Sequence, residues 1–395
     1  MSSISRVTRA ALGASVAALT LVAATGCGPD NSSQDIADPA PATTAATTAT
    51  ATPAASASAT KPGGPIPQLP SLDELKKWKF DDWDKWAQKN IITPAVKGYW
   101  DIQRMLNAKP PAQAPVTPPS PTAKPSTKPG DDGNDPMPTP IDAKAEAHPY
   151  TKQLHVDGKI FFEANGKDYV CSGTVISDPA HPGKSNLVWT AGHCAHDGKG
   201  AGFHQNIVFA PAFNSTATLS GGKKGTIEQA EPYGEWGTVD AVTSPQWSAE
   251  ADIHTPNSAA HYDFAILKVA NPAAGGKSLE ETVGGSVPVW FNAPREQVSI
   301  TAYGFPAGKP YDGAELERCD SGKPSRFSMD PARPSMYAIG CTSTGGSSGG
   351  GWFSNRDGKP ALVSNTSVGN DAGWQTGPYL DDVAAHALDY LSKKK

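Results

Sequence analysis

The sequence lacks three features that would each indicate a class of protein. It has no positive excess, with 34 Lys and Arg against 39 Asp and Glu and a net charge of −5, so nothing in the charge balance suggests nucleic-acid binding. Its N-terminal apolar run, residues 10–24, is too short to span a bilayer comfortably. It has only five cysteines, and its His and Cys residues do not have the spacing of a zinc site. We therefore expect no nucleic-acid partner, no metal and no cofactor.

Proline and glycine are unevenly spread, so the folded part must be shorter than the chain. Residues 27–68 are rich in Ala, Thr, Pro and Ser and predict a disordered tether. Residues 109–144 predict a second, stiff linker rich in proline. Between them, residues 69–108 hold four tryptophans, and Trp78, Trp83 and Trp86 belong to an apolar pattern that approximates one helical face. This helical segment is either a regulatory segment that docks on the main domain or a plain stalk.

The first residues carry an export signal. Arg6 and Arg9 precede the apolar run, which ends in the small residues of "AATGC". This pattern resembles a bacterial lipoprotein signal peptide, although Ala24 stands where that family usually has Leu. The resemblance implies cleavage after residue 26, a lipid on Cys27, and a location at the outer face of the bacterial membrane. The alternative is an ordinary secretory signal that happens to contain a cysteine, and a secreted protein.

Four cysteines remain if Cys27 is lipidated, an even number in an exported chain, which favours two disulfides. Four cysteines allow three pairings. We favour Cys171–Cys194 and Cys319–Cys341, because each pair closes a short loop of the kind that contributes about 3 kcal/mol.

A sequence pattern typical of a folded domain begins near residue 145 and continues to residue 395. Short apolar runs such as "GKIFFEA", "NLVWTAG" and "FAILKV" alternate with Gly, Pro, Asn and Asp. This spacing predicts an all-β barrel or sandwich. The tail "LDDVAAHALDYLSKKK" predicts a C-terminal helix. Its inward residues are Val383, Ala387, Tyr390 and Leu391.

Three motifs place reactive side chains beside these predicted strands. "NLVWTAGHC" ends an apolar run with His193, "HYDFAILKV" begins another with Asp263, and "GGSSGGGW" sets Ser348 among glycines. A Gly/Ser run by itself is usually a linker. The chain order His, Asp, Ser, however, is that of the chymotrypsin-like proteases. Each residue alone also has a structural reading, as a core histidine, a strand-end cap or a linker serine.

Together with Cys171 and Cys194, these motifs resemble the bacterial trypsin-like (chymotrypsin-fold) serine peptidases over roughly residues 150–392. The resemblance implies a chymotrypsin-like double β-barrel with a C-terminal helix. It implies a serine endopeptidase that forms an acyl-enzyme. Ser348 would be the nucleophile, His193 the base, and Asp263 the group that orients the base. The oxyanion would be held by the backbone amides of Gly346 and Ser348.

The sequence departs from the family at Ser347, where animal proteases usually have the Asp that pairs with a newly freed N-terminal amine. This puts activation of that kind in doubt. By resemblance, the substrate pocket comprises Thr342, Ser343, Ser367, Val368 and Gly369. Thr342 offers no carboxylate for Lys or Arg, and Thr366 stands where glutamyl endopeptidases have His. We therefore expect a small or medium uncharged residue on the acyl side of the cleaved bond, the P1 position.

Two other functions stay open. One is a catalytically silent, protease-like binding module at the cell envelope, which would keep the fold without a working oxyanion loop. The other is an envelope scaffold that uses the Trp-rich segment. As an endopeptidase, the protein would take a peptide or a protein as its substrate.

Overall fold

The first half of the β-rich region closes into a barrel. In the computed structural model, which describes residues 70–88, 92–122, 133–370 and 373–394, the barrel strands pair antiparallel in the order β2-β3-β4-β7-β6-β5. They are β2 (Asp157–Ala164), β3 (Lys167–Ile176), β4 (Leu187–Thr190), β5 (Gln205–Pro211), β6 (Trp236–Thr243) and β7 (Ala265–Ala270). β2 is buried on both faces: Ile160 and Phe162 face the main core, and Phe161 belongs to a second cluster.

The second half forms two antiparallel sheets, ordered β1-β9-β8-β12-β13 and β10-β11-β15-β14. The first contains β1 (Lys144–Ala145), β8 (Ile300–Gly304), β9 (Glu317–Gly322), β12 (Gly351–Arg356) and β13 (Lys359–Asn365). The second contains β10 (Ser325–Phe327), β11 (Met336–Gly340), β14 (Val368–Asn370) and β15 (Trp374–Gly377). Ile300, Trp352 and Tyr337 bring both sheets into one core. The predicted all-β, chymotrypsin-like fold is confirmed, with the second half built from two facing sheets rather than one closed ladder.

Both predicted disulfides are present. Cys171–Cys194 ties β3 to the turn after β4, and Cys319–Cys341 ties β9 to the residue that follows β11. The paired cysteines are 23 and 22 residues apart in the chain. Each bond therefore fixes one end of a loop that leads to the site described below.

Helices are short except at the C-terminus. α7 (Asp382–Lys393) buries the four side chains that the sequence predicts. The other α-helices in the described part of the chain are α1 (Leu72–Leu75), α2 (Phe80–Ala87), α3 (Ile102–Asn107), α4 (Ile227–Ala230), α5 (Pro245–Glu250) and α6 (Leu279–Val283). Among the described residues, none of the helices has the length and apolar character needed to cross a membrane.

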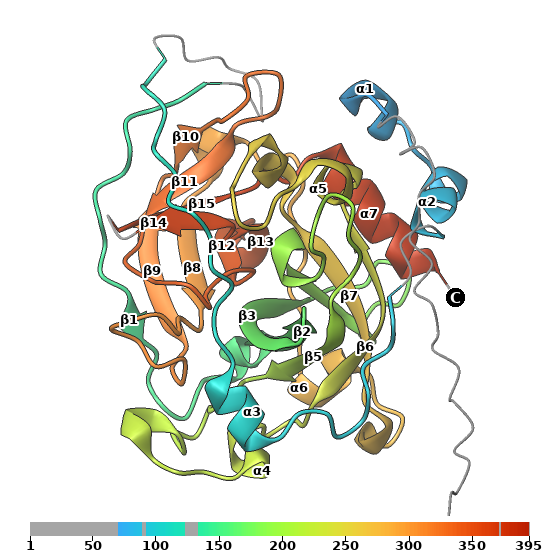
Figure 1. The fold of residues 1–395 in the computed structure, drawn as a ribbon, viewed down its shortest axis with the longest axis vertical. Helices are drawn as coiled ribbons and strands as arrows, with labels where there is room; N and C mark the ends of the chain where they lie inside the picture. The colour runs from blue at the N-terminus through green and yellow to red at the C-terminus, as the bar shows by residue number, and fades with distance from the viewer. Residues whose placement is uncertain (1–69, 89–91, 123–132, 371–372, 395) are drawn as a thin grey trace, which may run out of the picture. The chain divides into compact units, whose positions relative to one another are not determined.

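The Trp-rich segment lies against the β-rich region. Ser71 and Glu74 form the capping box that starts α1. Trp83 of α2 is buried and stacks on Tyr390 of α7, with ring centroids 6.3 Å apart, and Figure 1 shows these two helices side by side. Trp100 donates from Nε1 to the carbonyl of Asn206 at 2.8 Å. Both tryptophan rings belong to apolar clusters shared with the β-rich region.

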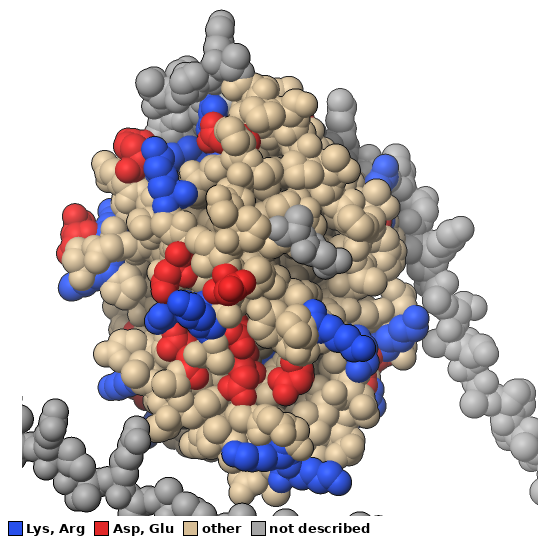
Figure 2. All heavy atoms as spheres, turned by 90° about the vertical axis from the view of Figure 1, so that its left-hand side faces the viewer, with Lys and Arg blue, Asp and Glu red and all other residues tan. Residues whose placement is uncertain are grey.

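Charged side chains of both signs share the molecular surface. Figure 2 shows Lys and Arg beside Asp and Glu on the face at the left of Figure 1. Ion pairs such as Arg318–Glu146, at 3.1 Å, join the two signs. Single ion pairs that stay partly open to solvent add little to stability.

One buried carboxyl group predicts a pH dependence of stability. Asp157 is 3% exposed, and burial raises its pKa to about 8, although a hydrogen bond from Thr174 opposes the shift. The folded state therefore keeps a proton that the unfolded chain releases near pH 4. The contribution of Asp157 to the free energy of unfolding should fall as pH rises from about 4 to about 8 and be constant above that.

We expect Asp157→Asn to remove this contribution. The difference in unfolding free energy between the variant and the wild type should shift in favour of the variant from pH 5 to pH 8, as measured by urea denaturation. Burial lowers the pKa of Lys159 to about 7, so this residue changes the pH dependence of stability with the opposite sign. Comparing the variant with the wild type removes the contribution of Lys159. A difference that is constant with pH would contradict the expectation.

Candidate active site

His193 and Asp263 meet because their strands pair. β4 and β7 are antiparallel neighbours with Thr190 opposite Ala265, so the residues just beyond these positions lie at the same end of the barrel. His193 sits in a 3-10 turn, Gly192–Cys194. Its backbone N–H donates to Asp263 Oδ1 at 2.9 Å, and its Nδ1 lies 2.8 Å from Oδ2. Both side chains are buried.

The carboxylate of Asp263 also receives a bond from the second half of the chain. Ser367 Oγ donates to Oδ2 at 2.5 Å, and the Asn365 side chain donates to the Asp263 carbonyl at 3.1 Å. Because a carboxylate can only accept, Nδ1 of His193 carries the ring proton. Nε2 is left as the basic nitrogen, and it has no hydrogen-bond partner among the described residues.

Ser348 lies in the loop between β11 and β12, here called the serine loop (residues 341–350). Its carbonyl accepts from the N–H of Ser172 at 2.7 Å, next to the Cys171–Cys194 disulfide that holds the His193 turn. A Cβ on Gly349 would lie 2.1 Å from Thr190 Oγ1, so only glycine allows the loop to approach β4 this closely. Within the described part of the chain, the Ser348 hydroxyl makes no hydrogen bond.

Gly346 shapes the backbone before the serine. Its φ is +100°, and a Cβ there would lie 2.8 Å from Ala307 N and from Phe305 O. Any side chain would therefore collide with backbone. In the described ranges, neither the Gly346 N–H nor the Ser348 N–H donates to a protein acceptor. These two amides are thus available to a ligand.

Ser347 has a structural task in the loop. Its Oγ donates to the carbonyl of Thr344 at 2.6 Å and accepts from Gln375 Nε2 at 3.3 Å. Ser347 is therefore hydrogen-bonded within the serine loop and to β15. Of the two adjacent serines, Ser348 is the one whose hydroxyl is uncommitted.

A cleft of about 490 Å³ opens beside Ser348. The predicted pocket residues Thr342, Ser343, Ser367 and Gly369 line it. Val368 does not: strand alternation turns its side chain to the opposite face of β14, where it is buried with Phe327 and Trp374. The sequence reasoning missed several other lining residues, which are Pro111, Gln113, Lys309, Pro310, Thr344, Gly345, Ser347, Thr366, Asn370, Gly373 and Gln375.

The solved structures that are similar to this chain include two serine proteases, AL20 and Anisep. The thermostable serine protease AL20 from an extremophilic microorganism is 32% identical, with a TM-score of 0.50, and the match covers 62% of this chain and 100% of that one. Protease Anisep from Arthrobacter nicotinovorans is 29% identical, with a TM-score of 0.51, covering 64% and 100%. No protein-family model and no curated protein matches the sequence.

The chain belongs to the trypsin-like, chymotrypsin-fold serine proteases. The family resemblance read from the three sequence motifs is thereby confirmed. The three motifs of this serine protease did not reveal most of the residues that line the cleft. No local pattern identifies Gln375, since its position depends on the pairing of β15 with β11 and β14. Pro111 and Gln113 lie in a segment whose composition indicates only a linker.

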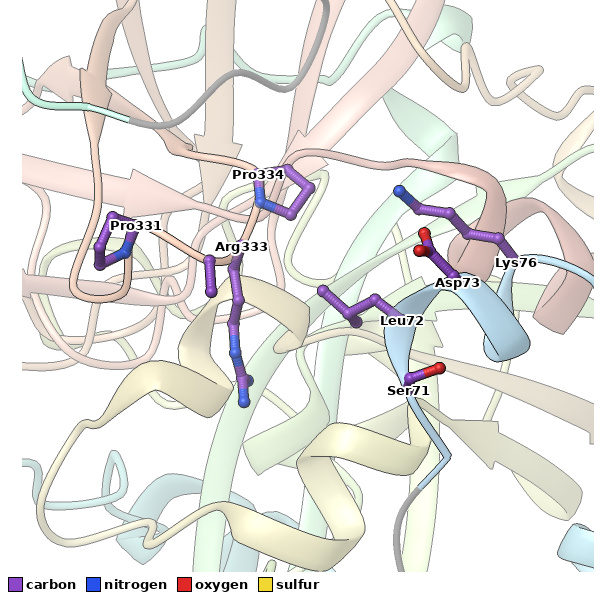
Figure 3. Close-up of a pocket in the computed structure, with 8 residues that line it drawn as sticks. Ser71, Leu72, Asp73, Lys76, Pro331, Arg333 and Pro334 are labelled. Carbon is purple, nitrogen blue, oxygen red and sulfur yellow. The ribbon is translucent and has the colours of Figure 1, made fainter.

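The protease has two further features that resemble sites. Cys171, His193 and Cys194 cluster within 4.8 Å, but both sulfurs are in a disulfide and are not thiolate ligands. A hollow of about 500 Å³ lies between α1 and residues 331–334, and Figure 3 shows Leu72 and Arg333 at its sides. None of His193, Asp263 and Ser348 lines this hollow.

Proposed function

We propose that this serine protease is a surface-tethered endopeptidase that cleaves peptide bonds with Ser348, His193 and Asp263. The observation that carries the proposal is the state of the His193 ring. Asp263 holds Nδ1, and Nε2 is an unpartnered base beside a loop whose Ser348 hydroxyl is also uncommitted. Catalytic hydrogen bonds often tighten only when substrate binds.

In this mechanism Ser348 Oγ attacks the carbonyl carbon of the substrate, and its proton passes to His193 Nε2. The carbonyl oxygen becomes an oxyanion that accepts from the Gly346 and Ser348 amides, each contributing about 3 kcal/mol. His193 then gives its proton to the leaving amine, and an acyl-enzyme remains. Water, deprotonated by the same nitrogen, releases the acid. Asp263 holds the ring orientation and stabilises the imidazolium.

The cleft argues against Lys or Arg at P1. Hydroxyl groups of Thr342, Ser343 and Thr366 line it together with the amide of Gln375. No Asp or Glu is among its described lining residues. A Lys or Arg side chain would therefore lose its hydration there without gaining an ion pair.

We expect a fluorophosphonate probe to label the wild type and Ser347→Ala, and not Ser348→Ala. Ser347→Ala should react more slowly, because the loop loses a hydrogen bond but keeps its nucleophile. Intact-protein mass spectrometry gives the extent of labelling, and circular dichroism shows that each variant is folded. A folded wild type that is never labelled would instead support the protease-like binding module.

The tether is proposed from the signal sequence alone, since Cys27 lies outside the described residues. The wild type should partition with membranes after export, and Cys27→Ser should be released into the medium. Palmitate incorporation in growing cells tests the lipid directly. A wild type that is already free in the medium and begins at another residue would contradict the lipoprotein signal.

A further inference from the structure

We infer that Gln375 is a positioning residue for the serine loop, holding it in shape through a neutral chain of hydrogen bonds. This inference rests on the proposed function. Gln375 is 3% exposed and lies on β15 below the loop. Its Nε2 donates to the Ser343 carbonyl at 2.9 Å and to Ser347 Oγ at 3.3 Å. Both donors of the amide therefore point to the loop.

The donor-to-acceptor direction of this chain of hydrogen bonds is fixed at both of its ends. Trp352 Nε1, which can only donate, bonds to Thr366 Oγ1 at 2.9 Å. Thr366 must then use its own proton on Gln375 Oε1, 3.2 Å away. At the other end, Ser347 gives its proton to the Thr344 carbonyl, which can only accept. One orientation of the Gln375 amide satisfies every partner.

The hydrogen-bond chain fixes Ser347, the residue between the two candidate oxyanion donors. Ser347 separates Gly346 from Ser348, so fixing its side chain limits how the two amides can turn. A buried ion pair in this place would carry a large desolvation penalty, which a neutral and fully satisfied chain avoids. Lys309 is the charged residue among the described residues that line the cleft with Gln375.

The first test is Gln375→Met, which approximately keeps the side-chain volume and removes the side-chain hydrogen bonds of residue 375. We expect kcat for a tetrapeptide nitroanilide with P1 Ala to fall about 30-fold, less than for full loss of an oxyanion donor, with KM changed less than threefold. The matched control is Gln246→Met. Gln246 is also buried, but its side-chain amide has no partner in the described structure, so kcat should stay at the wild-type value. A folded Gln375→Met with wild-type kcat would overturn the inference.

Gln375→Glu gives a readout that loss of stability alone would not produce. A carboxylate cannot donate to Ser343 or Ser347, whereas the protonated acid regains one donor, and burial favours the acid. The ratio of variant to wild-type kcat should therefore rise severalfold from pH 9 to pH 6. A ratio independent of pH would count against Gln375 as the positioning group. If the wild type itself hydrolyses nothing and is not labelled, the proposed function fails first.

A separate observation carries a second inference: we propose that residues 109–116, here called the strap, are an autoinhibitory contact across the cleft. Lys109 forms a parallel bridge with Tyr169 at the edge of β3. Pro110 lies over Gly345, 2.9 Å from where a Cβ would stand. Pro111 and Gln113 line the cleft with Ser348, and the Ala114 N–H donates to the His254 carbonyl at 2.9 Å.

The path of the strap explains why it would compete with substrate. Figure 1 shows the chain after α3 crossing the face between the barrel and the β12 sheet. It is bonded to the protein before and after its cleft-lining residues, at Val170 through Lys109 and at His254 through Ala114. A peptide long enough to cross the cleft must displace it, whereas a small reagent need only reach Ser348.

The test uses the full chain and two probes of different size. Ala114→Pro removes the N–H that bonds to His254, and Ala112→Gly is the control, because Ala112 is exposed. We expect Ala114→Pro to raise the rate of fluorescein-casein cleavage at least fivefold and to change the rate of fluorophosphonate labelling less than twofold. Ala112→Gly should match the wild type in both. An unchanged casein rate in a folded, labelled Ala114→Pro would overturn the strap inference, and absent labelling of the wild type would overturn the proposed function instead.

Discussion

Hydrogen bonds to Asp263 join the two halves of the protein at the candidate active site. Asp263 is fully buried and accepts four interactions: two at the carboxylate from His193, one from Ser367, and one at its carbonyl from Asn365. His193 belongs to the barrel, whereas Asn365 and Ser367 belong to the second half. A buried acceptor that loses its donors costs more free energy than the bonds gain when made. Separating the halves therefore disrupts the His193 pair as well.

The same principle operates on the serine loop with neutral groups. Ser172 links the loop to the barrel through two contacts, since its N–H donates to the Ser348 carbonyl and its Oγ to the Gly346 carbonyl at 2.9 Å. Gln375 links the loop to the second half. Glycines let the backbone come close enough for these bonds, and the bonds in turn restrict glycines that would otherwise be mobile. Order in the loop arises from its polar contacts rather than from apolar packing.

Local sequence was enough for features that depend on neighbouring residues: the cysteine pairs close short loops, and α7 has a helical period. It also singled out the candidate residues His193, Asp263 and Ser348 from short motifs, and the structure places the first two in contact. The sequence was insufficient where a role depends on strand register. Gln375 reaches the serine loop because β15 pairs with both β11 and β14. Val368 faces away from the cleft for the same reason, because its neighbours Ser367 and Gly369 take the cleft side.

The Pro-rich composition of residues 109–144 indicated a linker, and composition could not show what its first residues lie against. The strap makes few bonds, but it does not need many. Just before it, Arg104 pairs with Asp168 at 2.8 Å, and Trp100 is buried against Phe161 with ring centroids 5.5 Å apart. These anchors keep the strap at a high effective concentration at the cleft, so weak contacts suffice to occupy it. Proline lowers the entropy that the strap loses on docking. Cutting the chain between the anchors and the strap would remove that advantage at once, whereas loosening one hydrogen bond would shift the occupancy only in part.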